Sequence, residues 1–196
     1  EFKPIFYPDS VAVVGASQNE RKLGSVYIKR LLDAGFKGKL YAVGTKAGQI
    51  RGLPIYRNLR AIPEPIDYVI VAIPKQFILD LLDDCAAKGV KVVQIFSAGF
   101  SESGSEEGRR LEAELTRKAR NLGIRIIGPN CVGVYCPESG MHIPRALPRQ
   151  ERTGSAAFIC QSGGHSAACA EASLAQGIRL GKIVSFGNGC DLDSVD

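Results

Sequence analysis

Tryptophan is absent from this 196-residue sequence, and aromatic residues make up only 7% of it. Lysine and arginine are spread along the chain rather than clustered. Without a basic patch or aromatic platforms for base stacking, we expect no nucleic-acid partner. No apolar run approaches the ~18–20 residues that span a bilayer, and the first residues do not resemble a secretory signal, so we expect no membrane partner. The mild net charge of +5 fits a small anionic ligand.

The six cysteines lack the spacing of a metal site. No C-x-x-C pair is present, and Cys131 and Cys136 are too isolated from histidine to indicate zinc. Cys85 falls in a predicted helix and Cys160 at the end of a predicted strand, where free buried thiols are common. We therefore expect reduced thiols, no metal and a cytoplasmic location.

Buried strands and helices alternate over the first two-thirds of the chain. Residues 53–56 and 59–62 are interpreted as irregular or short helical turns. Because crossovers between parallel strands are right-handed, the order predicts an α/β fold, a Rossmann-like doubly wound parallel sheet. The pattern predicts strands at 11–14, 39–43, 68–73, 90–96 and 124–127, and helices at 24–34, 77–88 and 106–121.

The alternation stops after residue 136, where three prolines and a charged stretch predict a linker. It restarts with a strand at 156–160, a helix at 164–176 and a strand at 182–185. Two parallel strands and one helix cannot form an independent domain, so we expect the beginning of a second α/β domain from a longer protein. The predicted boundaries are 1–136 for the first domain, 137–153 for the linker and 154–196 for the second domain.

A glycine turn follows the first predicted strand at Gly15. Such a turn lets backbone N–H groups approach a phosphate without a side chain in the way. The next glycine is Gly24, so the loop does not match the G-x-G-x-x-G fingerprint. Lys46 stands near the end of the second strand, where NAD-binding proteins carry an acidic residue, and a cation favours the extra phosphate of NADP or coenzyme A. A simple tight turn and a solvated lysine are the plainer alternatives.

Two further turns lie at strand ends. Residues 128–133 follow the fifth strand, at the edge where open parallel sheets bind ligands. Ser162, Gly163 and Gly164 begin the helix of the second unit, where exposed N–H groups favour a phosphoryl group. Residues 128–133 together with the first turn predict a nucleotide-type ligand across the carboxyl ends of the strands.

Five short motifs follow one another along the chain: Val-Val-Gly-Ala-Ser at 13–17, Ile-Pro at 73–74, Ser-Ala-Gly-Phe at 97–100, Gly-Pro-Asn-Cys-Val-Gly at 128–133 and Cys-Gln-Ser-Gly-Gly at 160–164. They occur in the order seen in NDP-forming acyl-CoA synthetases, a family that includes ADP-forming acetate–CoA ligases and, more distantly, the succinyl-CoA synthetase alpha subunit. The chain resembles this family over essentially its whole length. The resemblance implies a CoA-binding domain followed by the start of a flavodoxin-like, succinyl-CoA-ligase-like domain that carries a phosphohistidine.

The resemblance also implies roles for matching positions. The family usually has Asn-Pro-Lys where this chain has Gly44, Thr45 and Lys46, so the adenosine contacts depart from the pattern. The implied coenzyme A contacts are Gly15, Ala16, Ser17, Arg21, Lys22 and Gly24 at the phosphates, Val43 and Lys46 at the adenosine, Ile73, Pro74 and Gln76 beside the cofactor, Ser97, Ala98 and Gly99 along the pantetheine path, and Asn130 and Cys131 near the thiol.

The implied activity joins a small carboxylic acid to coenzyme A and converts a nucleoside triphosphate to its diphosphate and phosphate, through acyl phosphate and phosphohistidine. ATP, Mg and an ATP-grasp domain or subunit belong to the full-length enzyme, with homo- or hetero-oligomers as a family expectation. The relay histidine lies beyond residue 196, so the segment alone is expected to be inactive. We expect His165 to cap or pack and His142 to face solvent.

Two alternatives stay open. One is a CoA-binding regulatory module or an acetyltransferase-associated domain. The other is an NADP-dependent oxidoreductase, against which the missing fingerprint glycines weigh.

Overall fold

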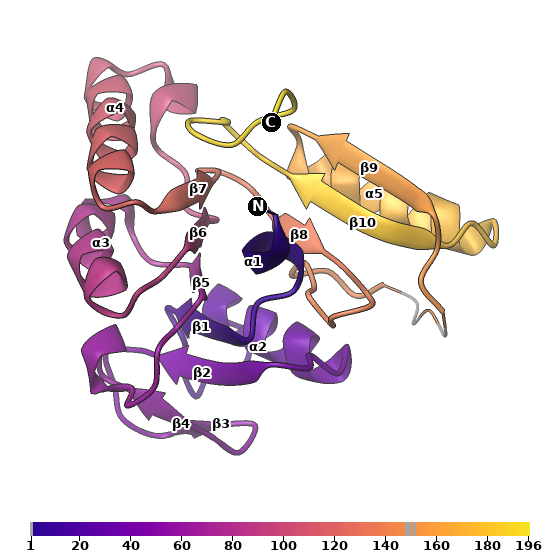
Figure 1. Ribbon diagram of the computed structural model, residues 1–196, viewed down its shortest axis with the longest axis horizontal. Coiled ribbons are helices and arrows are strands. Elements are labelled where there is room, and N and C mark those ends of the chain that lie inside the picture. Colours follow the sequence, from indigo (N-terminus) through magenta and orange to yellow (C-terminus); the bar gives the residue numbers. More distant parts are fainter. Residues whose placement is uncertain (1, 148–149, 151) are drawn as a thin grey trace.

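A seven-stranded sheet forms the first unit of the protein, in a computed structural model that describes residues 2–147, 150 and 152–196 (Figure 1). Its strand order is β3-β4-β2-β1-β5-β6-β7, parallel except for the β3–β4 pair. The chain runs outward from β1 to β2 and resumes on the other side at β5, so the switch point lies beside β1. The strands are β1 (Ser10–Val14), β2 (Lys39–Val43), β3 (Gln49–Ile50), β4 (Leu53–Tyr56), β5 (Tyr68–Val71), β6 (Val92–Ile95) and β7 (Arg125–Ile127).

Helices cover both faces of this sheet, which confirms the predicted doubly wound α/β class. Tyr27 and Leu31 of α2 share one buried cluster with Val11 of β1, while Leu82 of α3 and Leu115 of α4 share the other cluster. Strands that are buried on both faces carry unbroken apolar runs. The helices are α1 (Lys3–Phe6), α2 (Leu23–Asp33), α3 (Ile78–Ala87) and α4 (Glu106–Asn121), with short 3-10 turns η1 (Leu59–Ala61), η2 (Lys75–Phe77) and η3 (Ser101–Ser103).

The segment at 53–56, interpreted from the sequence as irregular, is the strand β4. It pairs in parallel with β2 and antiparallel with β3. The strand is short and contains Pro54, which has no N–H to donate, so the sequence carries a turn signal there. The neighbouring η1 is a short helical turn, as expected.

The second unit is a three-stranded sheet of order β8-β10-β9, with α5 (Gly163–Ala175) packed on one face. β9 (Ala156–Cys160) and β10 (Leu180–Ser185) are parallel, as expected, while β8 (Gly133–Tyr135) pairs antiparallel with β10. β8 lies before the predicted boundary at residue 136, yet its hydrogen bonds belong to the second sheet. β8 adds Tyr135 to the buried cluster that α5 forms with β9 and β10.

Part of the predicted linker is packed rather than extended. Met141 and Ile143 are fully buried, and Cys136 bridges Met141 as an antiparallel pair. The prediction that His142 faces solvent is wrong: its ring meets Tyr135 edge-on at 5.1 Å between centroids, and burial lowers its pKa. Residues 148, 149 and 151 of the predicted linker lie outside the described residues.

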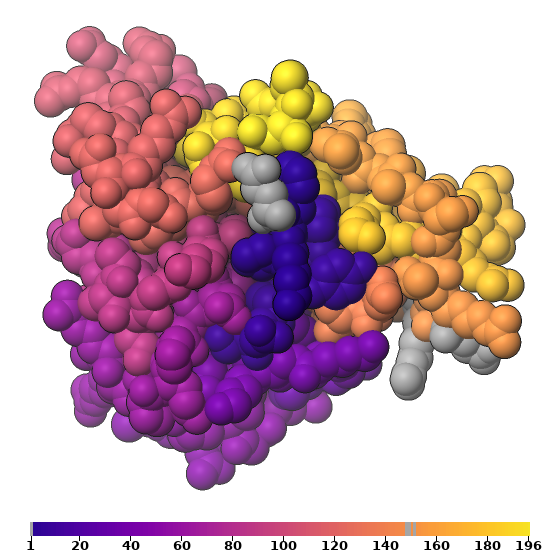
Figure 2. All heavy atoms as spheres, in the orientation of Figure 1, coloured from indigo at the N-terminus to yellow at the C-terminus, as the bar shows by residue number. Residues whose placement is uncertain are grey.

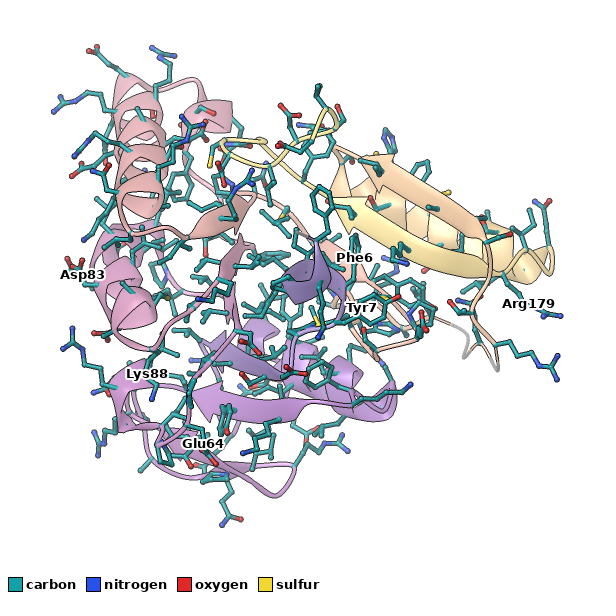
Figure 3. The ribbon with its side chains drawn as sticks, in the orientation of Figure 1. Phe6, Tyr7, Glu64, Asp83, Lys88 and Arg179 are labelled. Carbon is teal, nitrogen blue, oxygen red and sulfur yellow. The ribbon has the colours of Figure 1, made fainter. Side chains whose placement is uncertain are left out.

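The N-terminal residues join the two units. The space-filling view shows this segment between the first unit and β9–β10 (Figure 2). Phe6 and Tyr7 point toward the second sheet (Figure 3), where the Lys182 ammonium lies 5.4 Å and 5.6 Å from their ring centroids. The Tyr7 hydroxyl donates to Glu138 at 2.7 Å. Within the described residues, no helix has the length and apolar character that a membrane crossing needs.

Candidate functional site

Three glycines let the loops at the carboxyl edge of the sheet pack backbone against backbone. Gly15 has φ of +110°, and a Cβ there would overlap the carbonyl oxygen of Ala72, just after β5. A Cβ at Gly24 would overlap the carbonyl of Gly15, and one at Gly44 the carbonyl of Ala16. Gly24 therefore allows the close contact of helix and strand that the third glycine allows in a dinucleotide fingerprint.

The N–H groups of the glycine turn are already paired within the protein. Gly15 and Ala16 both donate to the carbonyl oxygen of Val43 at 2.9 Å, and Ser17 donates to Ser25 Oγ at 3.1 Å. The turn motif predicts free donors at these positions, and the structure differs because β2 lies alongside the turn. The N–H groups that could hold an anion at this edge are instead those at the beginning of α2.

The first turn of α2 is suited to an anion. Lys22 occupies the N-cap position and makes no side-chain capping hydrogen bond among the described residues. An uncapped helix N-terminus presents N–H groups and a positive dipole end. Arg21 and Lys22 are exposed beside it and add two positive charges.

The loop after β2 adjoins this turn. Val43 is buried and Lys46 is exposed just beyond it. A Cβ at Gly48 would lie 2.6 Å from the Gln18 side-chain nitrogen, so the two loops are in contact. Lys46, two residues before Gly48, is therefore exposed on a loop that contacts the loop after β1.

The loops after β5 and β6 are tied together at the same edge. Ser97 Oγ donates to the carbonyl of Ile73, and Lys75 Nζ donates to the carbonyl of Gly99 at 2.9 Å. Pro74, Gln76 and Ala98 are exposed on these loops. The two loops that the resemblance places beside a cofactor are thus joined to each other by hydrogen bonds.

A cavity of about 340 Å³ brings the motif at 128–133 against the motif at 160–164. Asn130 lies on its rim with φ of +58°, and Val132 leaves no room for a side chain at Gly163. Ser162 Oγ caps α5 by accepting from the His165 N–H at 3.3 Å. The lining residues are Phe96, Asn130, Cys131, Val132, Gln161, Ser162, Gly163 and Gly164.

Behind this cavity lies a buried polar network that the sequence analysis missed. Tyr68 donates to Gln94 Oε1 at 2.7 Å, and Gln94 Nε2 donates to Tyr27 and to the Val132 carbonyl, each at 3.3 Å. Tyr27 also donates to the Val132 carbonyl at 3.0 Å. A Cβ at Gly133 would overlap the Gln94 amide. The available signal was the single glutamine inside the predicted strand at 90–96.

Cys131 turns its thiol into the core rather than into the cavity. Its Sγ donates to the carbonyls of Ile95 and Ile127 at 3.4 and 3.5 Å, and burial raises its pKa to about 12. A thiol with this pKa stays protonated at neutral pH and is a poor nucleophile. Cys131 therefore contributes its backbone to the cavity.

Alkylation of the folded protein at pH 8 should discriminate among the cysteines. Cys85 and Cys131, both with a pKa of about 12 because of burial, are expected to stay unmodified, while the partly exposed Cys160 and Cys169 react. Peptide mass spectrometry after iodoacetamide treatment measures this, with urea-unfolded protein as the control. Rapid labelling of Cys131 in the folded chain would contradict the buried thiol.

The sequence matches two family models. Residues 9–137 match the model described as a CoA binding domain. Residues 153–196 match the model described as a succinyl-CoA ligase like flavodoxin domain. The gap between the two matches falls on the stretch predicted as a linker.

Similar proteins include ADP-forming ligases. The chain is 38% identical over 196 residues to the ADP-forming acetate–CoA ligase I subunit alpha of Pyrococcus furiosus, covering 98% of this chain and 42% of that protein. It is 38% identical over 192 residues to the ADP-forming acetate–CoA ligase I of Archaeoglobus fulgidus, covering 98% and 27%. A solved acetyl-coenzyme A synthetase 1 from Ca. Korarchaeum cryptofilum, in complex with phosphate and ADP, matches with a TM-score of 0.91 and 36% identity, covering 100% and 41%. The chain spans less than half the length of these proteins.

Proposed function

The chain belongs to the CoA-binding domain family, and from that membership and the geometry above we propose that it binds coenzyme A across the carboxyl ends of β1, β2, β5, β6 and β7. The observation that carries this proposal is the uncapped beginning of α2 beside the switch point, with Arg21 and Lys22 exposed there. Anions bind at such helix N-termini.

The chemical groups of coenzyme A match the loops that lie one after another along this edge of the sheet. Its pyrophosphate suits the beginning of α2, and the 3′-phosphate of its adenosine suits Lys46 rather than the carboxylate typical of NAD sites. The pantetheine arm would pass the loops at 73–76 and 97–99 and end at Asn130. The backbone of Gly15, Ala16 and Ser17 shapes the loop, because their N–H groups are paired within the protein.

We propose further that the chain is the coenzyme A-binding part of an ADP-forming acyl-CoA ligase. The cavity between Asn130 and α5 supports this, since it joins the thiol end of the cofactor to a helix start suited to a phosphoryl group at Ser162, Gly163 and Gly164. A small carboxylic acid would be the second substrate. The six free cysteines support a cytoplasmic enzyme.

ATP, Mg, a relay histidine and an ATP-grasp domain or subunit would come from other parts of the full-length ligase. Under this proposal the 196-residue chain binds coenzyme A without turning it over. A regulatory coenzyme A-binding module would bind in the same way, and a ligase activity of the full-length protein separates the two.

Thermal unfolding with coenzyme A, NADP and NAD at matched concentrations tests the binding proposal. Only coenzyme A is expected to stabilise the chain, by about 2.7 kcal/mol when it is present at roughly 100 times its Kd. Lys46→Ala is expected to weaken coenzyme A binding but not the binding of dephospho-coenzyme A, which lacks the 3′-phosphate. Stabilisation by NADP without stabilisation by coenzyme A would contradict the proposal and favour an oxidoreductase.

A further inference from the structure

The loop at 97–99 is held in one conformation by hydrogen bonds to both the N–H and the carbonyl of Gly99. Gly99 has φ of +98°, in the region that favours glycine. Its N–H donates to Glu102 Oε1, which also accepts from the Phe100 N–H at 3.2 Å. Its carbonyl accepts from Lys75 Nζ at 2.9 Å. The shape of this loop therefore depends on where the Glu102 carboxylate is placed.

Asn188, on the loop after β10, places that carboxylate. Its Nδ2 lies 2.6 Å from Glu102 Oε2, 2.6 Å from Glu112 Oε2 and 3.2 Å from Ser101 Oγ. A side-chain amide nitrogen carries two protons, so both serve this cluster. The amide also separates two carboxylates that would otherwise repel each other.

The loop that carries Asn188 is anchored on both units. The Asn188 N–H donates to the Pro129 carbonyl at 2.9 Å, and the Gly187 N–H donates to the Gln161 carbonyl at 3.1 Å. A Cβ at Gly187 would overlap the Pro129 carbonyl, so the loops pack closely. Gln161 lines the cavity and Pro129 precedes Asn130, which also lines it, so Asn188 is linked to both motifs.

We propose that Asn188 is a positioning residue for coenzyme A: through Glu102 it holds the loop at 97–99 in the shape that receives the pantetheine arm. This inference rests on the proposed function. It makes pantetheine binding depend on a side chain of the second unit, beyond the residues matched by the CoA-binding domain model. Docking of the loop after β10 and binding of the arm then favour each other.

A purely stabilising role for Asn188 predicts a different ligand dependence. Adenosine 3′,5′-bisphosphate carries the nucleotide end of coenzyme A without the pantetheine arm. Its proposed contacts at α2 and Lys46 lie on loops that Asn188 does not touch. A positioning role affects coenzyme A alone, whereas a general loss of structure weakens both ligands.

Isothermal titration of the 196-residue chain with both ligands separates these roles. Asn188→Ala and Glu102→Gln are each expected to weaken coenzyme A binding about tenfold and to leave bisphosphate binding unchanged. The double variant is expected to lose no more than either single variant, because the two residues act through one contact. Asn58→Ala is the matched control: it removes the amide that caps η1, away from the loop at 97–99, and should leave both affinities unchanged.

Circular dichroism monitors folding, and Glu102→Gln, which keeps the side-chain shape, maintains the test if Asn188→Ala unfolds. Equal losses for the two ligands, unchanged coenzyme A affinity in both single variants, or additive losses in the double variant would overturn the inference alone. A parent chain that does not bind coenzyme A would overturn the proposed function and this inference with it.

Discussion

Alanine in place of Gly15 is expected to lower the free energy of unfolding by about 3 kcal/mol and to weaken coenzyme A binding at least tenfold. The backbone at this position has φ of +110°, and the added Cβ would overlap the carbonyl oxygen of Ala72. Because the obstacle is backbone, relief requires β1 and β5 to move apart. Urea denaturation followed by circular dichroism measures the loss of stability, and titration with coenzyme A measures the loss of binding.

Gly35→Ala is the matched control for that change. Gly35 also has a positive φ, +69°, but no atom lies within 4 Å of where its Cβ would stand. It should cost only about 1 kcal/mol and leave ligand binding intact, because it carries conformational strain without a clash. Equal losses at the two glycines would show that the contact with Ala72 is not decisive.

A loss of stability in the Gly15→Ala variant would correct the expectation, based on the turn motif alone, that a side chain at Gly15 affects only ligand binding. From the motif, a valine at Gly15 should block the ligand and leave the fold intact. The contact between the turn and Ala72 makes a larger side chain destabilising as well. Lys46 is therefore the better position for testing ligand binding without disturbing the sheet.

Gln94→Leu is expected to lower the free energy of unfolding by roughly 3 kcal/mol. Gln94 is 1% exposed, and its Oε1 is the acceptor for the fully buried Tyr68 hydroxyl. Leucine would leave that hydroxyl without an acceptor in an apolar surrounding. The Val132 carbonyl would keep its bond from Tyr27 but lose the one from Gln94. Chemical denaturation of the variant measures the effect.

The pair Gln94→Leu and Tyr68→Phe supplies the control. Removing both partners removes the orphaned hydroxyl, and such paired replacements cost less than leaving one group unsatisfied. The double variant should therefore be more stable than Gln94→Leu alone. If the losses simply add, the hydrogen bond between these two side chains is not what stabilises the site.

Local sequence patterns were sufficient to predict which loops meet at the carboxyl edge of the sheet. Carboxyl ends of parallel strands meet at one edge, so the strand pattern alone places Gly15, Ser97 and Asn130 together. The strands β2 and β9 and the helix α4 begin and end at the predicted residues, because their apolar periodicity and flanking glycines are local signals.

Other features depend on which distant groups become hydrogen-bond partners. The pairing of the Gly15 and Ala16 N–H groups with Val43, the membership of β8 in the second sheet, and the packing of the half-buried His142 on Tyr135 are of this kind. Periodicity reports how buried a segment is, but it does not report what the segment faces. A short strand such as β8 carries too few residues to show a period at all.

The sequence by itself determined the α/β alternation, the order of the motifs at the strand ends and the positive charges at Arg21, Lys22 and Lys46, because these follow from neighbouring residues. Only the tertiary structure decided that the N–H groups of the glycine turn are paired while the beginning of α2 has no side-chain cap, that Gln94 supports the cavity from behind, and that Asn188 reaches Glu102. Each of these depends on backbone and side-chain groups that are far apart in the chain, and the tertiary packing selects among their available partners.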